Sequence, residues 1–284
     1  MIELKNLYYS YPSAHLQAIN GINVSIKKGE IFGFLGPSGA GKSTLQKILI
    51  GVLKGYEGTV TVMNQEISNH TADFYEKLGI AFETPDFYQK FTARENLEFF
   101  LSFYKKREID LEELMEKVGL DGKEDIRVSD YSKGMHMRLN ICRALLHDPE
   151  LIFLDEPTAG LDPVNVQKVK ELIREKQNQG KTIILNTHNM HVADSLCDRV
   201  AFIVDGEINE VDAPAKLKAS HQENKLSIVH GNSSNFKTDH FPLTGLAENT
   251  RFQEILRSNS IQKIETPEKT LEEVFIEVTG RSLQ

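Results

Sequence analysis

Short apolar runs between turn residues dominate the first half of the chain. Four such runs, at 31–35, 151–154, 182–185 and 201–204, show no alternation of polar and apolar positions. Runs of this kind are typical of strands that are covered on both faces, as in the parallel sheet of an α/β domain. Residues 60–62 instead suggest an antiparallel edge strand. The pattern therefore predicts an α/β fold with a mixed sheet.

A helical pattern replaces these runs between about residues 85 and 147. Thr92 and Glu95 have the spacing of a capping box, in which each side chain satisfies a backbone N–H group of the first helical turn. Apolar residues then recur on one helical face, at Leu97, Phe100, Leu101 and Tyr104. A second helical stretch covers 109–118. We expect a helical subdomain inserted into the α/β core.

The composition changes after about residue 216. The segment 221–249 is rich in Asn, Ser and His and contains short strand-like pieces, and 270–279 has the pattern of a closing amphipathic helix. We therefore expect one large domain at 1–216 and a small α+β accessory domain at 217–284.

Composition narrows the classes of function. The 284 residues carry 33 Lys and Arg against 41 Asp and Glu, a formal charge of −8, so no nucleic-acid partner is expected. No apolar run approaches the roughly 20 residues of a membrane span, and the first residues do not resemble a signal peptide. The chain is expected to stay in the cytosol and to meet a membrane through a partner. The two cysteines, Cys142 and Cys197, are expected to be buried reduced thiols.

A glycine-rich segment follows the first apolar run. It reads Gly36-Pro37-Ser38-Gly39-Ala40-Gly41-Lys42-Ser43 and continues with Thr44. The pattern G-x-x-x-x-G-K-S/T is that of a phosphate-binding loop, in which glycines let successive backbone N–H groups point at the phosphates. Lys42 is expected to reach the β- and γ-phosphates, and the Ser43 hydroxyl to ligate Mg²⁺. The segment predicts ATP and Mg²⁺ as ligands.

Two carboxylates stand at the end of a second apolar run. Asp155 and Glu156 directly follow 151–154, at the strand end where ligands bind in parallel sheets. Asp155 is expected to hold Mg²⁺, and Glu156 to activate the attacking water as general base. Adjacent buried carboxylates repel each other unless a cation is present, and the magnesium–ATP complex would supply one.

The segment Tyr131-Ser132-Lys133-Gly134-Met135 resembles the signature sequence L-S-G-G-Q of ATP-binding-cassette (ABC) ATPases, although Tyr131, Lys133 and Met135 differ from the consensus. Its Ser132 lies 23 residues before Asp155, the first residue of the strand-end acidic pair. Ser132 is placed to cap the helix that follows. The resemblance implies that Ser132, Lys133 and Gly134 face the nucleotide held by the opposite subunit of a dimer.

Further segments resemble ABC motifs in the order of the family. Ala159-Gly160-Leu161-Asp162 is similar to the D-loop, so Gly160, Leu161 and Asp162 are expected to contact the partner subunit. Its first residue departs from the usual Ser. His188, directly after the run at 182–187, resembles the switch histidine that contacts the γ-phosphate, and it is expected to be catalytic together with Glu156.

Two positions are matched less closely. Tyr11 resembles the aromatic residue that stacks on adenine, with Tyr8 and Tyr9 as alternatives. Glu83 stands where the family usually has Gln, at the entry to the helical block. A carboxylate there can still ligate Mg²⁺ or order water, so Glu83 joins Ser43 and Asp155 as an expected magnesium ligand.

The resemblance covers roughly residues 1–215 and implies the P-loop fold of an ABC ATPase. It implies an ATP-hydrolysing subunit that works as a homo- or heterodimer at the cytoplasmic face of the cell membrane and drives an integral-membrane permease. In the family the helical block meets that permease. The phenylalanines of this block are expected to be mostly core, with one or two at the docking surface: Phe87, Phe91, Phe99, Phe100 and Phe103.

Three features resemble the stand-alone ATPase subunits of bacterial exporters of drugs or antibiotic peptides. They are the signature segment, Glu83 and the ending 270–275. An importer subunit and a soluble ABC ATPase acting on chromosomes or ribosomes are the alternatives. The latter usually carry a long coiled coil or two cassettes, and neither pattern occurs here. A P-loop small-molecule kinase would not need 131–135 or His188, and a non-catalytic module would not need Lys42 and the acidic pair.

Overall fold

The computed structural model describes all residues except 13–15, 107, 223, 233–234, 259 and 283–284. Its centre is a six-stranded sheet in the order β10-β9-β3-β8-β7-β6. The neighbouring strands β9, β3, β8, β7 and β6 pair in parallel, and β10 pairs antiparallel with β9. Their bounds are β3 Ile31–Leu35, β6 Leu78–Ala81, β7 Leu151–Asp155, β8 Thr182–Thr187, β9 Arg199–Val204 and β10 Glu207–Asp212.

The strands predicted from continuous apolar runs are confirmed, and the structure shows why these runs contain no alternating polar positions. Every residue of β3, β7 and β8 is buried, because both faces of the sheet are covered. One face packs with helix α1 (Lys42–Leu49) against a second, antiparallel sheet, and the other face packs against the helices described below.

The second sheet has the order β2-β1-β4-β5. Its strands are β1 Ile2–Tyr9, β2 Ile19–Ile26, β4 Glu57–Val62 and β5 Gln65–Glu66. The antiparallel strand predicted at 60–62 is confirmed, but its placement at an edge is wrong. Strand β4 pairs with β1 on one side and with the two-residue β5 on the other. A short 3-10 turn, Ile67–Asn69, follows β5.

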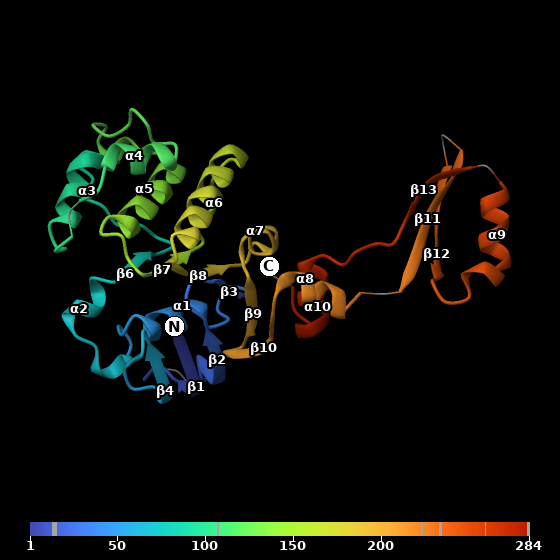
Figure 1. Ribbon diagram of the computed structural model, residues 1–284, viewed down its shortest axis with the longest axis horizontal. Coiled ribbons are helices and arrows are strands. Elements are labelled where there is room, and N and C mark those ends of the chain that lie inside the picture. The colour runs from blue at the N-terminus through green and yellow to red at the C-terminus, as the bar shows by residue number, and fades with distance from the viewer. Residues whose placement is uncertain (13–15, 107, 223, 233–234, 259, 283–284) are drawn as a thin grey trace.

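Helices gather above β6 and β7, as Figure 1 shows in green. They are α3 Ala93–Leu101, α4 Leu111–Lys117 and α5 Lys133–Leu145, with a 3-10 turn at Val128–Asp130. The short helix α2 Ala72–Tyr75 lies apart from them, and its Phe74 belongs to the core cluster of the antiparallel sheet. The capping box is confirmed, since Glu95 N donates to Thr92 Oγ1 at 3.1 Å and Thr92 N donates to Glu95 Oε2 at 2.8 Å. The helical insertion predicted between 85 and 147 is thus present.

Helices α6 (Pro163–Asn178) and α7 (Met190–Leu196) follow β7 and β8 and cover the same face of the sheet as α5. Asp162 caps α6, accepting hydrogen bonds from the N–H groups of Val164 and Asn165. Within the described residues, no helix is long and apolar enough to cross a membrane.

A small antiparallel sheet stands apart from this body, at the orange end of the chain in Figure 1. It has the order β12-β11-β13 and packs on helix α9 through Ile228, Phe241 and Ile255. The elements are β11 Lys225–Asn232, β12 Asn235–Pro242, a 3-10 turn at Leu246–Glu248, α9 Thr250–Arg257 and β13 Ile261–Glu265.

Two helices frame this sheet in the sequence and pack on the large body. They are α8 (Pro214–Ser220) and α10 (Leu271–Thr279). Leu217, Val274 and Phe275 belong to the main core cluster, and the Phe275 ring meets the Phe202 ring edge to face at a centroid distance of 5.2 Å. The chain therefore leaves the core after α8 and returns to it in α10.

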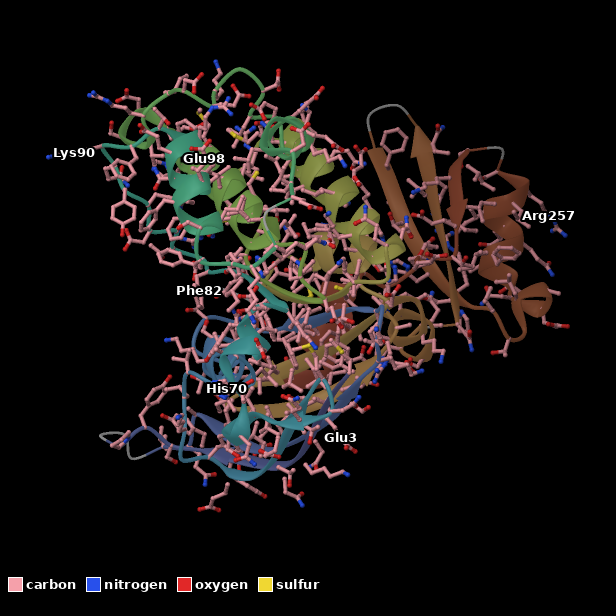
Figure 2. All side chains as sticks on the ribbon, turned by 60° about the vertical axis from the view of Figure 1, so that its left-hand side comes forward. Glu3, His70, Phe82, Lys90, Glu98 and Arg257 are labelled. Atoms are coloured by element: carbon pink, nitrogen blue, oxygen red, sulfur yellow. The ribbon has the colours of Figure 1, made fainter. Side chains whose placement is uncertain are left out.

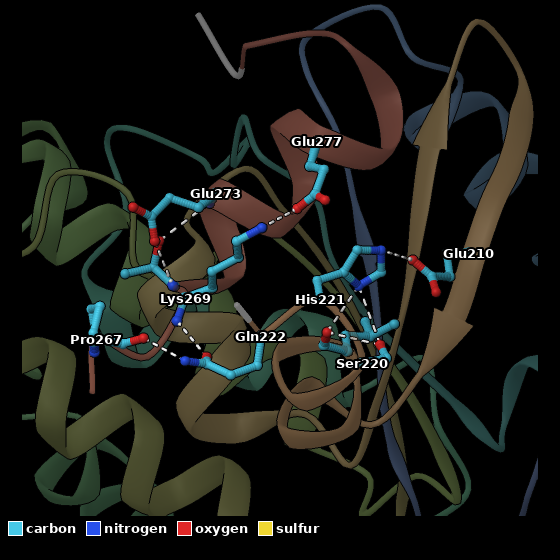
Figure 3. Close-up of polar contacts among 10 residues, drawn as sticks. Glu210, Ser220, His221, Gln222, Pro267, Lys269, Glu273 and Glu277 are labelled. Carbon is cyan, nitrogen blue, oxygen red and sulfur yellow. Dashed lines mark hydrogen bonds and ion pairs between the residues drawn. The ribbon is translucent and has the colours of Figure 1, made fainter. Parts of the chain in front are cut away.

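The two connecting segments are tied to each other (Figure 3). The Gln222 amide donates to the Pro267 carbonyl and accepts a hydrogen bond from Lys269 N at 3.2 Å. Thr270 and Glu273 then form a second capping box at the start of α10. The position of the small sheet thus depends on contacts between segments that lie 45 residues apart.

Replacing Phe275 with Ala is expected to lower the free energy of unfolding by about 3–5 kcal/mol, because it removes a fully buried ring and leaves a cavity against Phe202. Ile276→Ala is the matched control, since Ile276 is 43% exposed on the same helix, and it is expected to change stability by about 0.5 kcal/mol or less. Urea unfolding measures both. Equal losses in the two variants would contradict the packing of α10 on the core.

Candidate nucleotide-binding site

The loop between β3 and α1 is shaped by two glycines. A Cβ atom on Gly36 would lie 2.0 Å from the Ile203 carbonyl oxygen, and one on Gly41 would lie 2.7 Å from the Ala18 carbonyl oxygen. Gly41 also has φ +108°, which L side chains rarely adopt. Only glycine fits at these positions, so the chain curls tightly at the N-terminus of α1, where N–H groups are free to meet an anion.

Lys42 closes the loop. Its Nζ atom donates to the carbonyl oxygens of Gly36 at 2.6 Å and Pro37 at 2.8 Å. Burial lowers the pKa of the Lys42 ammonium, while the carboxylates of Glu156 and Asp155 act in the opposite direction. The ammonium is therefore held at the mouth of the loop, next to acidic groups from another strand.

A cavity of about 350 Å³ opens beside this loop. It brings together most of the residues predicted from the sequence. The lining residues are Tyr11, Ala18, Ser38, Gly39, Gly41, Lys42, Ser43, Thr44, Glu83, Asp155, Glu156 and His188. The other predicted loop residues shape the loop from behind: Gly36 and Pro37 through their carbonyl groups, and Ala40 as a buried side chain.

Glu156 is held by three donors. Its carboxylate accepts hydrogen bonds from Thr187 Oγ1 at 2.9 Å and from His188 N at 2.8 Å, and His188 Nδ1 lies 2.7 Å from Oε1. Its own backbone takes φ +48°, and its N–H group donates to the Asn186 carbonyl. The end of β8 thus orients the residue expected to be the base, and His188 joins it directly.

Asp155 lies beside Glu156 in a less favourable electrostatic setting. Burial, and then the neighbouring carboxylates of Glu83 and Glu156, raise the pKa of Asp155 to about 6, against the opposing effects of Lys42 and Asn186. Ionising Asp155 beside these carboxylates therefore costs free energy.

Of the three candidate tyrosines, Tyr11 is the one that lines the cavity. Its hydroxyl shares a 3.1 Å hydrogen bond with Thr44 Oγ1. Tyr9 is buried and meets the Tyr11 ring edge to face at 5.1 Å. The ring of Tyr11 is half-buried and available at the cavity wall.

The signature and D-loop segments do not belong to the cavity lining. Ser132 caps α5, accepting a hydrogen bond from Met135 N at 3.2 Å. A Cβ atom on Gly134 would lie 3.3 Å from the Gly160 carbonyl oxygen and 3.2 Å from Leu161 Cδ2, and the Lys133 side chain passes close to Gly160. The two segments therefore contact each other within one chain, away from its own phosphate loop.

Arg138 and Asn165 connect these two segments and were missed by the sequence analysis. The buried Arg138 guanidinium donates to the Gly134 carbonyl at 3.2 Å, to the Asn165 side chain at 2.9 Å, and to two carbonyls after α4. Asn165 in turn donates to Asp162. The spacings Gly134 to Arg138 and Asp162 to Asn165, one helical turn each, were the available signal.

The aromatic residues of the helical block are more exposed than predicted. Phe87 is buried, but Phe91 and Phe103 are 40% and 66% exposed, and Phe99 and Phe100 are half-buried. The prediction that most of them are core is wrong, because α3 turns Ala93, Leu97 and Leu101 inward instead.

Two of these rings, Phe100 and Phe103, border a groove of about 330 Å³ at the junction of the helical block and the core. Phe82 lies at this junction in Figure 2. The Arg143 guanidinium lies 4.9 Å and 5.1 Å from the ring centroids of Phe87 and Phe100, so a cation–π contact stiffens one wall. Phe103 also lines the groove.

A glycine-and-lysine loop between a parallel strand and a helix, facing an acidic pair on the same sheet, defines a P-loop nucleotide-binding protein. The comparisons with known proteins give the family. Residues 19–159 match the ABC transporter family model, and residues 225–268 match the model of the fluoroquinolone efflux ABC transporter C-terminal domain.

Individual relatives agree with these matches. The chain is 45% identical to a fluoroquinolones export ATP-binding protein of Mycobacterium tuberculosis, over 100% of this chain and 94% of the relative. It is 34% identical to the Nod factor export ATP-binding protein I of Rhizobium sp. (strain N33), over 94% and 93% of the two chains. Among solved structures, a dimeric ATP-binding cassette bound to ADP and Pi in a post-hydrolysis state matches with a TM-score of 0.68 and 29% identity, over 75% of this chain and 98% of that one.

The chain therefore belongs to the ATP-binding proteins of ABC transporters, and it is an ABC-type ATPase coupled to transport.

Replacing Asp155 with Asn is expected to stabilise the nucleotide-free protein at neutral pH. The folded-state pKa of Asp155, about 6, lies above its ordinary value of 3.8, so its ionisation destabilises the fold by up to about 3 kcal/mol above pH 6. This penalty disappears as the pH falls below about 4, where the side chain is protonated in both states. The variant's advantage in urea unfolding, measured in EDTA, should therefore be present at pH 7.5 and shrink toward pH 4. An advantage that is independent of pH would contradict this.

Proposed function

We propose that this chain energises the export of fluoroquinolones or chemically similar drugs through a separate membrane-spanning partner. The observation that carries the proposal is full-length similarity to a relative named as a fluoroquinolones export ATP-binding protein. The match of the accessory sheet to a fluoroquinolone efflux domain supports it. The Nod factor relative is named for a different cargo. The drug assignment therefore depends more on the accessory domain than on the ATPase core.

The cavity residues support the following roles in ATP hydrolysis. The loop from Gly36 to Thr44 binds the phosphates, with Lys42 neutralising their charge. Tyr11 stacks on the adenine ring. Glu156 accepts a proton from the attacking water, and His188, which contacts its carboxylate, holds the γ-phosphate.

The cavity also fits a magnesium ion. Ser43, Asp155 and Glu83 offer one hydroxyl and two carboxylates, the oxygen donors that Mg²⁺ prefers. The ion would neutralise charge on the β- and γ-phosphates. It would also offset the burial and the carboxylate repulsion that together raise the pKa of Asp155.

The active site is proposed to be composite. Ser132, Lys133 and Gly134 do not line the cavity of their own chain, and the N-terminus of α5 that Ser132 caps is suited to bind phosphate. In a dimer they would close over the nucleotide of the other subunit, with the D-loop beside them. The matched solved cassette is described as dimeric, which supports this arrangement; the partner here is a second copy or a related cassette.

The aromatic groove bounded by Phe82, Phe100 and Phe103 is the proposed docking site for the membrane subunit. It lies between the core and the helical block, so closure of the dimer would move it. Its exposed rings support contact with a largely apolar segment of the partner. Docking there would hold the chain at the cytoplasmic face of the membrane.

The proposal is tested by disrupting the gene in its host and restoring it. Loss of the gene should increase sensitivity to fluoroquinolones and raise drug accumulation in cells. The wild-type gene should reverse both effects, and a Lys42→Ala version should not. Unchanged sensitivity and accumulation in the disrupted strain would reject this cargo while leaving ATP hydrolysis by the protein open to direct assay.

Replacing Glu156 with Gln is expected to preserve ATP binding and to lower phosphate release at least about 100-fold, since it removes the base and keeps its shape. The unhydrolysed nucleotide should trap a dimer that size-exclusion chromatography detects with Mg²⁺ and ATP. Lys42→Ala should bind nucleotide weakly and stay monomeric. The matched control is Glu116→Gln, an exposed residue of α4, which should behave as wild type. Wild-type turnover in Glu156→Gln would exclude Glu156 as the base.

A further inference from the structure

The nucleotide cavity has an unusual balance of charge. Among the described residues, three carboxylates line it, from Glu83, Asp155 and Glu156, and Lys42 is the one Lys or Arg residue in the lining. A nucleoside triphosphate that enters this cavity without a metal ion adds up to four more negative charges. The backbone N–H groups of the loop are partial charges, and they do not offset three full ones.

Glu83 differs from the other two carboxylates in its surroundings. Glu156 is held by three donors at the end of β8, and Asp155 has the Asn186 side chain beside it. Glu83 forms no hydrogen bond or ion pair with any residue in the described part of the chain, and its side chain is exposed. Its charge is therefore offset only at longer range, by Lys42.

The sheet places this free carboxylate at the phosphate end of the cavity. Strand β6 pairs in parallel with β7, with Ala81 opposite Leu154. Glu83 is the second residue after Ala81, and Asp155 and Glu156 are the first and second residues after Leu154. All three therefore stand at the same edge of the sheet. Glu83 is close enough to Lys42 and Asp155 to act on both electrostatically.

We propose that Glu83 makes nucleotide binding conditional on a divalent cation, because it repels the metal-free nucleotide and attracts the metal complex. The inference rests on the proposed function of the cavity as an ATP site, and it adds a selectivity that this function does not require. A neutral amide of the same shape at position 83 would ligate the cation but would not repel the free triphosphate. The carboxylate therefore separates the two forms of the nucleotide by charge.

The expected effect is a change in the coupling between metal and nucleotide. Removing the single negative charge of Glu83 from the cavity wall is expected to change the coupling between metal binding and nucleotide binding by a factor of about 10. The quantity to measure is the dissociation constant in EDTA divided by that in Mg²⁺, taken for a fluorescent ATP analogue at constant ionic strength. This ratio reports binding and does not depend on turnover.

The test compares Glu83→Gln, Glu83→Asp and wild type. The ratio should fall about 10-fold in Glu83→Gln, through tighter binding in EDTA, weaker binding in Mg²⁺, or both. It should be retained in Glu83→Asp, which keeps the charge. Glu248→Gln, an exposed residue of the small sheet's domain, removes the same charge far from the cavity and should leave the ratio unchanged. Thermal melting of each variant checks that it is folded.

The outcomes separate the two proposals. A wild-type protein that binds no nucleotide even with Mg²⁺ would overturn the assignment of the cavity as an ATP site. A protein that binds nucleotide, but whose ratio stays within about twofold after Glu83→Gln, would overturn the role of Glu83 alone. A ratio that falls equally in Glu248→Gln would attribute the effect to net charge and would also overturn it.

Discussion

Close contact between backbones at the phosphate loop is the constraint on which the rest of the structure depends. The loop can turn into α1 only because Gly36 lies against the Ile203 carbonyl and Gly41 against the Ala18 carbonyl. These contacts connect the loop to β9 on one side and to the start of β2 on the other. The cavity thus forms where the parallel sheet and the antiparallel sheet meet, and it is lined by Asp155, the last residue of β7, and by Tyr11, which follows β1.

A second set of contacts joins segments that lie far apart in the sequence. Arg138 joins the signature turn to Asn165 at the start of α6, and Gly134 packs directly on the D-loop. The two segments proposed to face a partner subunit are therefore one continuous surface. Glu156, the proposed base, and His188 are joined separately, at the end of β8. Binding of a second subunit would bring these two assemblies together.

The sequence predicted the parts of this protein whose chemistry lies in adjacent residues. The loop 36–44, the acidic pair and the capping box at Thr92 could be identified because their function requires a fixed local spacing. The link between Arg138 and Asn165 could not, since it joins helices whose packing no local pattern specifies. The burial of Phe99 and Phe100 was overestimated for a related reason: α3 has nine residues, and the residues that it turns inward depend on the elements packed against it. The same holds for strand β4, whose outer partner β5 is too short to show a pattern.

The small sheet is inserted between two helices that belong to the core, and this arrangement has a consequence for how the gene can be shortened. A stop codon after α8 would remove α10 as well as the sheet, and it would uncover the Phe202 ring that Phe275 covers. Deleting residues 223 to 266 and joining α8 to α10 by a short linker would keep the contact between Phe275 and Phe202. The small sheet could therefore be gained, lost or exchanged in evolution as a unit, without changes to the packing of the ATPase core.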